Sequence, residues 1–370
     1  MSLKVTAEEI REKIMTYTEI LKILCDTMTV SGNEQNAQEA VRTLAGDCFD
    51  EIYTDPARNL VLVRKCGKEN ARRILLDAHM DEIGMMVRAV HDGGFVTVVN
   101  IGGLDRQILP ASDCLLWGDK KTIPGVFAAT PPHLYGVLCR DVPSWDKLVI
   151  DTGYTKEELT ELGIKIGTPV SYKRQWTNLL NNRITGQGFD DKCCAAGLLY
   201  AVMHTPKDAL AGDIYITLTS GEEIGGHGAD CAAFGIQPDI AIVTDANFAA
   251  APGVSADESA PMGDGPMVSL SAVTDRKLTK KILSIAGSAG IHVNTVVEAT
   301  NTGTNANTLV YTQYGVPAAV VSIPLGGMHS YNEYLSIDDG EAFARLIQAC
   351  IVNPDLAEGF DMVTEKGGLA

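Results

Sequence analysis

The chain has 370 residues, of which 45% are hydrophobic and 21% charged, and its formal net charge is −17 at pH 7. A chain of this length exceeds what a single hydrophobic core usually serves, so two domains are expected. The acidic balance argues against a nucleic-acid partner, because phosphate binding requires basic patches on the protein.

The start of the sequence and its use of cysteine indicate a cytoplasmic protein. Residues 1–5 lead directly into a charged amphipathic segment without the apolar core of a signal peptide, and no later apolar run is long enough to span a membrane. The nine cysteines are scattered, with no C-x-x-C pair, which predicts reduced thiols. Cys193 and Cys194 lie beside a candidate ligand, but we interpret them as core packing because no activating base is evident.

The first 84 residues predict two helices and two strands. Thr6-Ala7-Glu8-Glu9 has the pattern of a capping box and predicts a helix that runs to about Cys25. Ser31-Gly32-Asn33-Glu34 predicts a second helix start of the same kind. The apolar runs 60–64 and 73–78 predict strands, and the second one reads as buried on both faces.

The pattern changes between residues 85 and 177. Short β-like runs are separated there by Gly, Pro and Asp turns, with one clear helix near residues 156–162. The predicted strands are 85–90, 95–101, 114–117, 135–138 and 169–172. This part of the chain therefore predicts a small β-rich domain.

After residue 178, strands alternate with helices. Strands are predicted at 213–219, 240–243 and 318–323, and helices follow Asp190 and lie near 227–234, 275–289 and 337–352. This alternation predicts an α/β fold with a mixed, mostly parallel sheet flanked by helices. We expect a discontinuous catalytic domain, residues 1–84 and 178–370, interrupted by an inserted domain, residues 85–177.

Five acidic or histidine-bearing clusters follow predicted strands or lie where a loop enters a helix. They are His79-Met80-Asp81, Phe189-Asp190-Asp191-Lys192, Gly221-Glu222-Glu223, Thr244-Asp245 and Met328-His329-Ser330. Ligands of open α/β sheets bind outside the carboxyl ends of the strands, so these clusters can converge. Histidines with carboxylates suit zinc or cobalt, and one spare carboxylate is left to act as a base. The pattern predicts a two-metal hydrolase.

Within this set, His79 and Asp81 are two residues apart on an extended segment, so the Asp81 carboxylate can accept the second imidazole N–H. A core histidine with a polar neighbour would explain this pair alone equally well. Asp77 and Glu82 are interpreted as structural. Asp190 is the candidate bridge between two cations about 3.5–4 Å apart, and Asp191 is expected to cap the following helix or to meet its dipole.

The adjacent pair Glu222-Glu223 is the sharpest local signal. Gly221 before it and Gly225-Gly226 after it allow the backbone to bend, so one glutamate can bind metal while the other takes a proton from the attacking water. A solvated acidic turn would explain an isolated pair, but four further clusters recur at matching positions.

These motifs resemble those of the tetrahedral aminopeptidase family, whose members include glutamyl, leucyl and lysyl aminopeptidases, some of them long labelled endoglucanases. The resemblance rests on residues 78–84, 189–192, 222–225 and 328–330, with further likeness at 102–110 and 130–134 in the insert. It covers almost the whole chain in the same order. Lys192 stands where arginine is common, and Asn305 stands where the family usually has aspartate; neither change removes a proposed ligand.

The resemblance implies a complete assignment of the site and of the assembly. It places one metal ion on His79 and Asp245, a second on Glu223 and His329, a bridge at Asp190, a general base at Glu222, and Asp81 as the residue that orients His79. It also implies a zinc-peptidase-like domain with an inserted β-barrel-like domain, and dimers that assemble into a hollow tetrahedral dodecamer admitting short peptides.

We therefore expect a metal-dependent aminopeptidase with two divalent ions, zinc or cobalt, in each subunit. The alternatives are an endoglucanase, a non-catalytic peptide-binding or assembly protein that has kept the fold, and a deacylase of N-acyl amino acids. The three tryptophans are few for sugar stacking. The specificity pocket is expected around residues 246–265 and 300–307, which carry no decisive charge.

Overall fold

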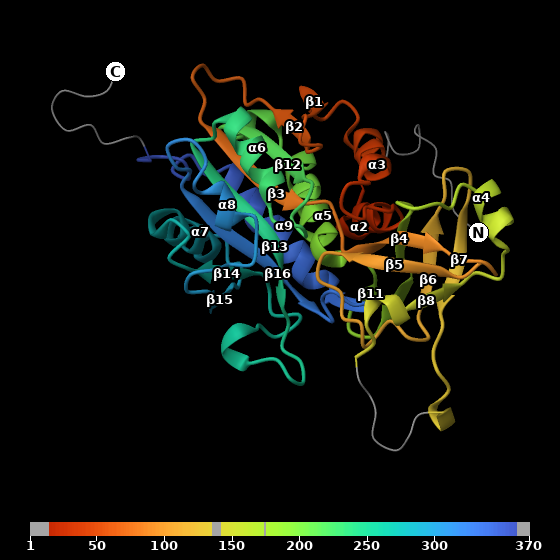
Figure 1. Cartoon of the computed structure of the whole chain (residues 1–370). Coiled ribbons are helices and arrows are strands. Elements are labelled where there is room, and N and C mark those ends of the chain that lie inside the picture. Colours follow the sequence, from red (N-terminus) through yellow and green to blue (C-terminus); the bar gives the residue numbers. More distant parts are fainter. Residues whose placement is uncertain (1–14, 135–141, 174, 361–370) are drawn as a thin grey trace.

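The computed structural model describes residues 15–134, 142–173 and 175–360, and it contains two separate β structures (Figure 1). The larger is an eleven-stranded mixed sheet with helices on both faces, and the smaller is a closed barrel of six strands. The expected α/β fold with a mixed sheet and a barrel-like second unit is confirmed.

The centre of the large sheet is a block of parallel strands. In spatial order they are β12 (Asp213–Thr219), β3 (Arg73–His79), β13 (Ile240–Phe248) and β16 (Ala318–Gly326). The last three are buried on both faces, which explains why their sequences read as continuous apolar runs. Because the four strands are parallel, their carboxyl ends meet at one edge of the sheet.

Antiparallel strands flank this parallel block. They are β2 (Leu60–Arg64) and β1 (Glu51–Thr54) on one side, and β17 (Glu333–Ser336), β11 (Arg183–Gly186) and β10 (Trp176–Leu179) on the other. A two-stranded branch, β14 (Met267–Leu270) and β15 (Asn294–Val297), pairs with β16 through β14.

Two sets of helices cover the two faces of the sheet (Figure 1). One face packs against α2 (Tyr17–Cys25), α3 (Gln35–Ala45), α5 (Phe189–Met203), α7 (Arg276–Ser288) and α9 (Ile337–Ile351). The other face packs against α6 (His227–Ile236) and α8 (Ala306–Leu309). Alternate residues of one strand therefore enter different cores, as Ile242 and Val243 of β13 do. No helix in the described part of the chain is long and apolar enough to cross a bilayer.

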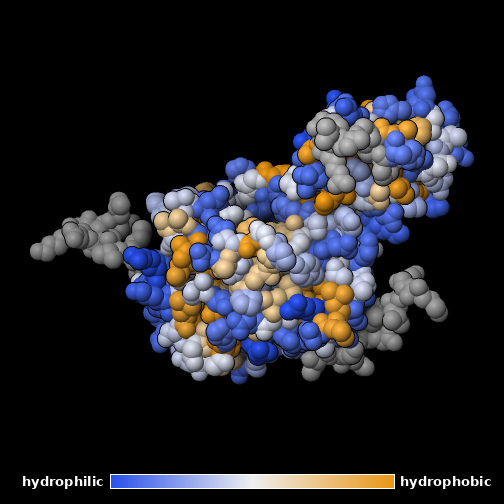
Figure 2. All heavy atoms as spheres, turned by 90° about the horizontal axis from the view of Figure 1, so that it is seen from below, coloured by the Kyte–Doolittle hydropathy of each residue, from blue (hydrophilic) through white to orange (hydrophobic). Residues whose placement is uncertain are grey.

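The barrel has its own hydrophobic core. Its strands are β4 (Gly84–Val90), β5 (Val96–Ile101), β6 (Asp113–Trp117), β7 (Thr122–Phe127), β8 (Val149–Asp151) and β9 (Pro169–Tyr172), closed in the order β4-β5-β8-β7-β6-β9. The helix α4 (Lys156–Glu161) completes it and begins with a capping box at Thr155 and Glu158. Figure 2 shows this part as a lobe that projects from the larger body. The predicted domain limits, 1–84 with 178–370 and 85–177, stay a prediction.

Several predicted local features differ from the structure. The motif at Thr6 and the predicted strand 135–138 lie outside the described residues, whereas α2 begins with its own capping box at Thr16 and Glu19. The predicted cap at Ser31 is wrong: α3 begins after Glu34, which forms no side-chain cap, because the Ser31 hydroxyl donates to Asp81 at 2.6 Å. The strand β13 also continues beyond residue 243, because it pairs with β16 as far as Phe248.

The packing of α5 on α9 gives a test of the core. A Cβ atom on Gly197 would lie 2.5 Å from the ring of Phe343. We expect Gly197→Ala to lower the free energy of unfolding by about 1–3 kcal/mol, because overpacking outweighs the gain in helix propensity. Urea unfolding measures the change.

Gly287→Ala in α7 is the matched control, because nothing lies within 4 Å of its Cβ position. The same substitution should there raise the free energy of unfolding by up to about 1 kcal/mol. Equal effects at the two positions would show that contact with Phe343 does not limit the packing of α5.

Candidate metal centre

The predicted site residues come together at the carboxyl ends of the parallel strands. His79 is the last residue of β3, Asp245 lies in the second half of β13, and Asp190 lies at the start of α5. Glu222 and Glu223 lie in the turn after β12. The remaining two, Asp81 and His329, follow β3 and β16.

Asp190 lies between the two histidines. Its Oδ1 is 3.2 Å from Nε2 of His79, and its Oδ2 is 3.4 Å from Nε2 of His329. On the far side, His79 Nε2 is 3.6 Å from Asp245 Oδ1, and His329 Nε2 is 3.3 Å from Glu223 Oε1. The cluster therefore has two halves that share one carboxylate, which is the arrangement of a bridging ligand.

Backbone carbonyls orient both imidazole rings. His79 Nδ1 lies 2.8 Å from the carbonyl oxygen of Asp81, and His329 Nδ1 lies 3.0 Å from that of Gly103. A carbonyl only accepts, so each Nδ1 carries a proton, and Nε2 is the nitrogen of each ring that faces Asp190. Gly103 follows the barrel strand β5, so the barrel lobe helps to complete the site. A Cβ atom there would come within 3.1 Å of the His329 ring.

The Asp81 carboxylate fixes the turn after β12 that carries Glu222 and Glu223, called the glutamate turn below. It accepts the backbone N–H groups of Glu222 at 3.1 Å and Glu223 at 3.3 Å, together with the Ser31 hydroxyl at 2.6 Å. Its Oδ1 is 3.7 Å from His79 Nδ1, so the hydrogen bond to that ring is made by the Asp81 backbone. Asp81 thereby links β3, the loop before α3 and the turn after β12.

Glu333 is a site residue that sequence reasoning missed. It is 3% exposed, and its Oε2 accepts the backbone N–H groups of Phe189 at 2.7 Å and Asp190 at 3.4 Å. Its Oε1 accepts the N–H of His329 at 3.2 Å. One carboxylate thus fixes the backbone of two candidate ligands. The available signal was an acidic residue four positions after a candidate histidine, at the start of β17.

Below His79, a buried polar layer supports the end of β3. Asp77 is fully buried and accepts hydrogen bonds from Thr217 at 2.6 Å and from the Asn305 amide at 2.8 Å. Burial raises the pKa of Asp77 to about 6, while these two donors oppose the rise. The amide of Asn305 can donate a hydrogen bond to the Asp77 carboxylate. An aspartate at position 305 could do so only if one of the two acids were protonated, so asparagine suits this position.

Lys192 makes a buried ion pair that ties α5 to the segment after β3. Its Nζ lies 3.2 Å from Glu82 Oε2 and 3.1 Å from the carbonyl oxygen of Thr27. The other Glu82 oxygen accepts the N–H of Thr29 at 3.1 Å. Glu82 and Asp77 are thus both structural, as predicted from the sequence.

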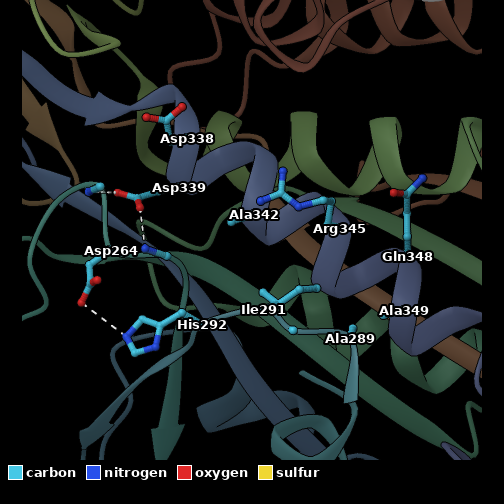
Figure 3. Close-up of a pocket in the computed structure, with 13 residues that line it drawn as sticks. Asp264, Ala289, Ile291, His292, Asp338, Asp339, Ala342, Arg345, Gln348 and Ala349 are labelled. Carbon is cyan, nitrogen blue, oxygen red and sulfur yellow. Dashed lines mark hydrogen bonds and ion pairs between the residues drawn. The ribbon is translucent and has the colours of Figure 1, made fainter. Parts of the chain in front are cut away.

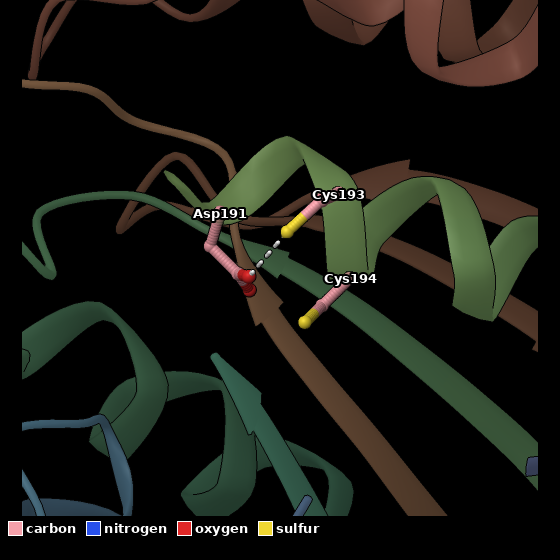
Figure 4. Close-up of side chains that lie close together, drawn as sticks. All are labelled: Asp191, Cys193 and Cys194. Atoms are coloured by element: carbon pink, nitrogen blue, oxygen red, sulfur yellow. Dashed lines mark hydrogen bonds between the residues drawn. The ribbon is translucent and has the colours of Figure 1, made fainter. Parts of the chain in front are cut away.

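Asp191, Cys193 and Cys194 form a buried group behind the site (Figure 4). The Cys193 thiol donates to Asp191 Oδ1 at 3.9 Å, whereas Asp191 Oδ2 has no hydrogen-bond partner among the described residues. The predicted cap by Asp191 is not formed, since the N-cap of α5 is Gly188 and carries no side-chain bond, but Asp191 lies in the first turn of α5, where the alternative of meeting the helix dipole applies. Both thiols lie in the hydrophobic core.

The site is a buried cluster of competing charges. Burial and neighbouring carboxylates raise the pKa of Glu222 to about 8 and that of Asp245 to about 7, against the attraction of His79. Burial opposes ionisation of Asp190 too, but hydrogen bonds from His329 and His79 hold its pKa well below the usual range. More negative groups converge here than the two imidazoles can neutralise.

The donor set fits divalent cations. Imidazole nitrogens and carboxylate oxygens are ligands of zinc and related metals. His79, Asp190 and Glu223 offer atoms within 4.8 Å of one another, as do His79, Asp191 and Asp245. Bound cations would relieve the repulsion that raises the pKa values of the buried carboxyls.

A cavity of about 520 Å³ lies elsewhere in the molecule, between α9 and the segments before β14 and β15 (Figure 3). Two sets of polar contacts are drawn there: Asp339 accepts the N–H groups of Gly263 and Gly265 at 2.7 Å each, and Asp264 lies 3.4 Å from His292. Asp339 therefore anchors the segment that leads into β14. None of the candidate ligands lines this cavity.

A mixed α/β sheet with an added barrel and a histidine–carboxylate cluster at the strand ends defines a hydrolase of the metallopeptidase class. The model of the M42 glutamyl aminopeptidase family matches residues 59–346. The chain belongs to this family, whose members are metal-dependent aminopeptidases.

Three relatives illustrate the similarity. A lysyl aminopeptidase of Pyrococcus furiosus is 30% identical over 342 residues, which are 91% of this chain and 97% of that protein. The aminopeptidase APDkam598 of Desulfurococcus kamchatkensis has a TM-score of 0.88 at 30% identity, with 95% of this chain and 99% of that one covered. The TET1 peptidase of Pyrococcus horikoshii, which can assemble into a tetrahedron or a large octahedral shell, has a TM-score of 0.80 at 29% identity, with 91% and 99% covered.

The charge cluster predicts how the metal-free protein responds to pH. Glu222, Asp245 and Glu333 have pKa values of about 8, 7 and 8 in the folded protein, whereas the ordinary pKa values of these carboxyl groups are 3.8 to 4.5. Between these two ranges of pH the folded protein therefore holds protons that the unfolded chain has released. His329, with a pKa of about 11, stabilises the fold fully below 6.5 and less above it. Both effects lower stability as the pH rises. We expect the Tm in chelator to fall from pH 5 to pH 8.

Differential scanning calorimetry with and without added zinc measures this dependence. Zinc should raise the Tm more at pH 8 than at pH 5, because it binds the deprotonated ligands. A Tm in chelator that rises across this window would contradict the proposed repulsion.

Proposed function

We propose that this protein binds two divalent metal ions and removes the N-terminal residue from short peptides, with Glu222 as the general base. The observation that carries the proposal is the position of Asp190, whose two carboxylate oxygens face two different histidines at 3.2 and 3.4 Å. A shared carboxylate of this kind is what a pair of neighbouring cations requires.

His79 and Asp245 would hold one ion, Glu223 and His329 the other, and Asp190 would bridge them. Zinc and cobalt suit this ligand set. When bound, the ions polarise the scissile carbonyl group and lower the pKa of the attacking water. The protein itself would supply the general base, the oriented metal ligands and the turn after β12 that holds the two glutamates in place.

Glu222 is the candidate base because its carboxylate lies in the cluster but is not needed as a metal ligand. Within residues 15–134, 142–173 and 175–360 the side-chain carboxylate of Glu222 makes no hydrogen bond or ion pair, whereas that of the neighbouring Glu223 contacts His329. It would take a proton from the water and return it to the leaving amine. Asp81 would keep Glu222 in place through the backbone N–H that it accepts.

The alternatives have less support. A glycosidase needs two carboxyl groups free to flank one glycosidic bond, but Glu223 is engaged with His329. A non-catalytic binding protein has no need of a complete ligand set with an unengaged glutamate beside it. Deacylation of N-acyl amino acids would use the same two-metal chemistry, and a substrate panel distinguishes it from peptide hydrolysis.

We also propose a homo-oligomer, with the tetrahedral dodecamer as the expected form. The related TET1 peptidase assembles into closed shells. The end of α6 and the turn after α8 carry Phe234, Tyr311 and Tyr314, which are 64%, 74% and 93% exposed and would be covered in such an assembly. The cytoplasmic location and the domain limits predicted from the sequence stay predictions.

Replacing the base should separate catalysis from metal binding. We expect Glu222→Gln to keep both metal ions and to lower kcat on aminoacyl-coumarin substrates by about 10²–10⁴-fold, because proton transfer is lost. Glu223→Gln is the matched comparison and should lose metal as well as activity. Elemental analysis of the dialysed proteins measures the ions. A Glu222→Gln protein with the parent rate would refute this role.

Metal removal tests the cofactor. Dialysis against a chelator should abolish release of the N-terminal residue, and zinc or cobalt should restore it, because the carboxylates and imidazoles alone cannot polarise the carbonyl group. Soluble cellulose should remain intact throughout. Peptide hydrolysis that persists after the ions are removed would exclude a metal mechanism.

A further inference from the structure

A second polar group lies beside Asp245 on the same face of the sheet. Asn247 follows Asp245 by two positions in β13, so both side chains project to the same side. The Asn247 amide donates to Glu298 Oε1 at 2.7 Å, and its own oxygen accepts the N–H of Phe248 at 2.7 Å. Glu298 directly follows β15, so the structure brings it to the candidate ligand from 53 residues further along the chain.

Half of this carboxylate is buried without a partner. Glu298 Oε2 has no hydrogen-bond partner among the described residues, and neither have the hydroxyls of Ser269 and Ser322, whose residues are fully buried. Unsatisfied buried polar atoms are costly and uncommon. Burial raises the pKa of Glu298, and the Ser269 and Asn247 side chains oppose the rise. Ser269 thus lies close to Glu298 without meeting the geometry of a hydrogen bond.

These atoms share one face of the sheet. Ser322 of β16 is the pairing partner of Asp245 on one side and of Met267 on the other. Ser269 is two positions after Met267 in β14, so it points to the same side as Met267. The unsatisfied atoms therefore extend from Asp245 across β16 toward Glu298. A ligand that reaches Glu298 Oε2 must be a hydrogen-bond donor, because a carboxylate only accepts, whereas the two serine hydroxyls can accept or donate.

From this arrangement we propose that Glu298, held by Asn247, binds the cationic side chain of the substrate's N-terminal residue, with lysine preferred. The inference rests on the proposed aminopeptidase function, in which the substrate's N-terminal residue would lie beside the ions that His79, Asp190 and Asp245 would hold. From Asp245 to Asn247 the chain advances about 7 Å, a distance that the four-carbon stem of lysine can span. The ammonium group would supply the donor that Glu298 Oε2 lacks.

The geometry favours lysine over arginine. Asn247 already donates to Oε1, so Oε2 is the oxygen without a bond, whereas a guanidinium group binds best to two unengaged oxygens of a carboxylate. An ammonium group is a compact charge with three donors, and it can use Oε2 together with the nearby Ser269 hydroxyl. The net charge of −17 also attracts cationic substrates.

The test compares lysyl-coumarin with norleucyl-coumarin, which has a neutral side chain of similar length. The metal-loaded protein should show a kcat/KM for lysine at least tenfold higher than for norleucine. Glu298→Gln should reduce this ratio by roughly ten- to a hundredfold, the value of a charge-assisted hydrogen bond. Glu157→Gln, at an exposed acid in the helix α4 of the barrel lobe, is the control and should leave the ratio unchanged.

The possible failures are distinguishable. Efficient norleucine turnover without a preference for lysine would overturn the inference and leave the proposed function intact. An equal loss of kcat/KM on both substrates in Glu298→Gln would have the same consequence. If no aminoacyl substrate is cleaved, the proposed function fails. Calorimetric binding of lysinamide and norleucinamide to the metal-loaded protein then tests the pocket separately, and equal affinities would overturn it.

Discussion

The repulsion among buried carboxylates at the strand ends is the constraint on which this structure depends. Asp190, Glu223 and Asp245 are nearly inaccessible to solvent and face only two imidazole rings. Such a group is stable only if cations or protons offset its charge. The raised pKa values of Glu222 and Asp245 express this in the metal-free state. In the proposed function, metal binding and the activation of a base both follow from this charge distribution.

The candidate ligands are held in place by residues outside the proposed ligand set. Asp81 collects hydrogen bonds from the serine hydroxyl before α3 and from the glutamate turn, and Glu333 joins the start of α5 to the histidine loop. Gly103 brings a carbonyl oxygen from the barrel to His329. The barrel is consequently part of the site as well as a separate lobe, because one imidazole depends on it for its orientation.

The strand β13 connects chemistry to substrate choice. Asp245 and Asn247 lie on one face of it, the first in the ion cluster and the second in contact with Glu298. The short branch β14–β15 brings the carboxylate to this face, and Asp339 anchors the segment that leads into the branch. If the inferred pocket exists, a change in this branch would alter it without moving a candidate ligand.

The sequence by itself determined the α/β class, the buried central strands and the clusters at their ends, because apolar periodicity and chain order are local properties. The residue types of the five clusters and their matching positions after predicted strands also predicted the candidate ligand set. Only the tertiary structure decided that Ser31 serves Asp81 instead of a helix cap, that Glu333 fixes two ligand loops, and that Glu298 reaches Asn247. All of these contacts but that of Glu333 with His329 join residues 50 or more positions apart. Which of many polar side chains meet there depends on how the loops pack, and no periodic pattern records this.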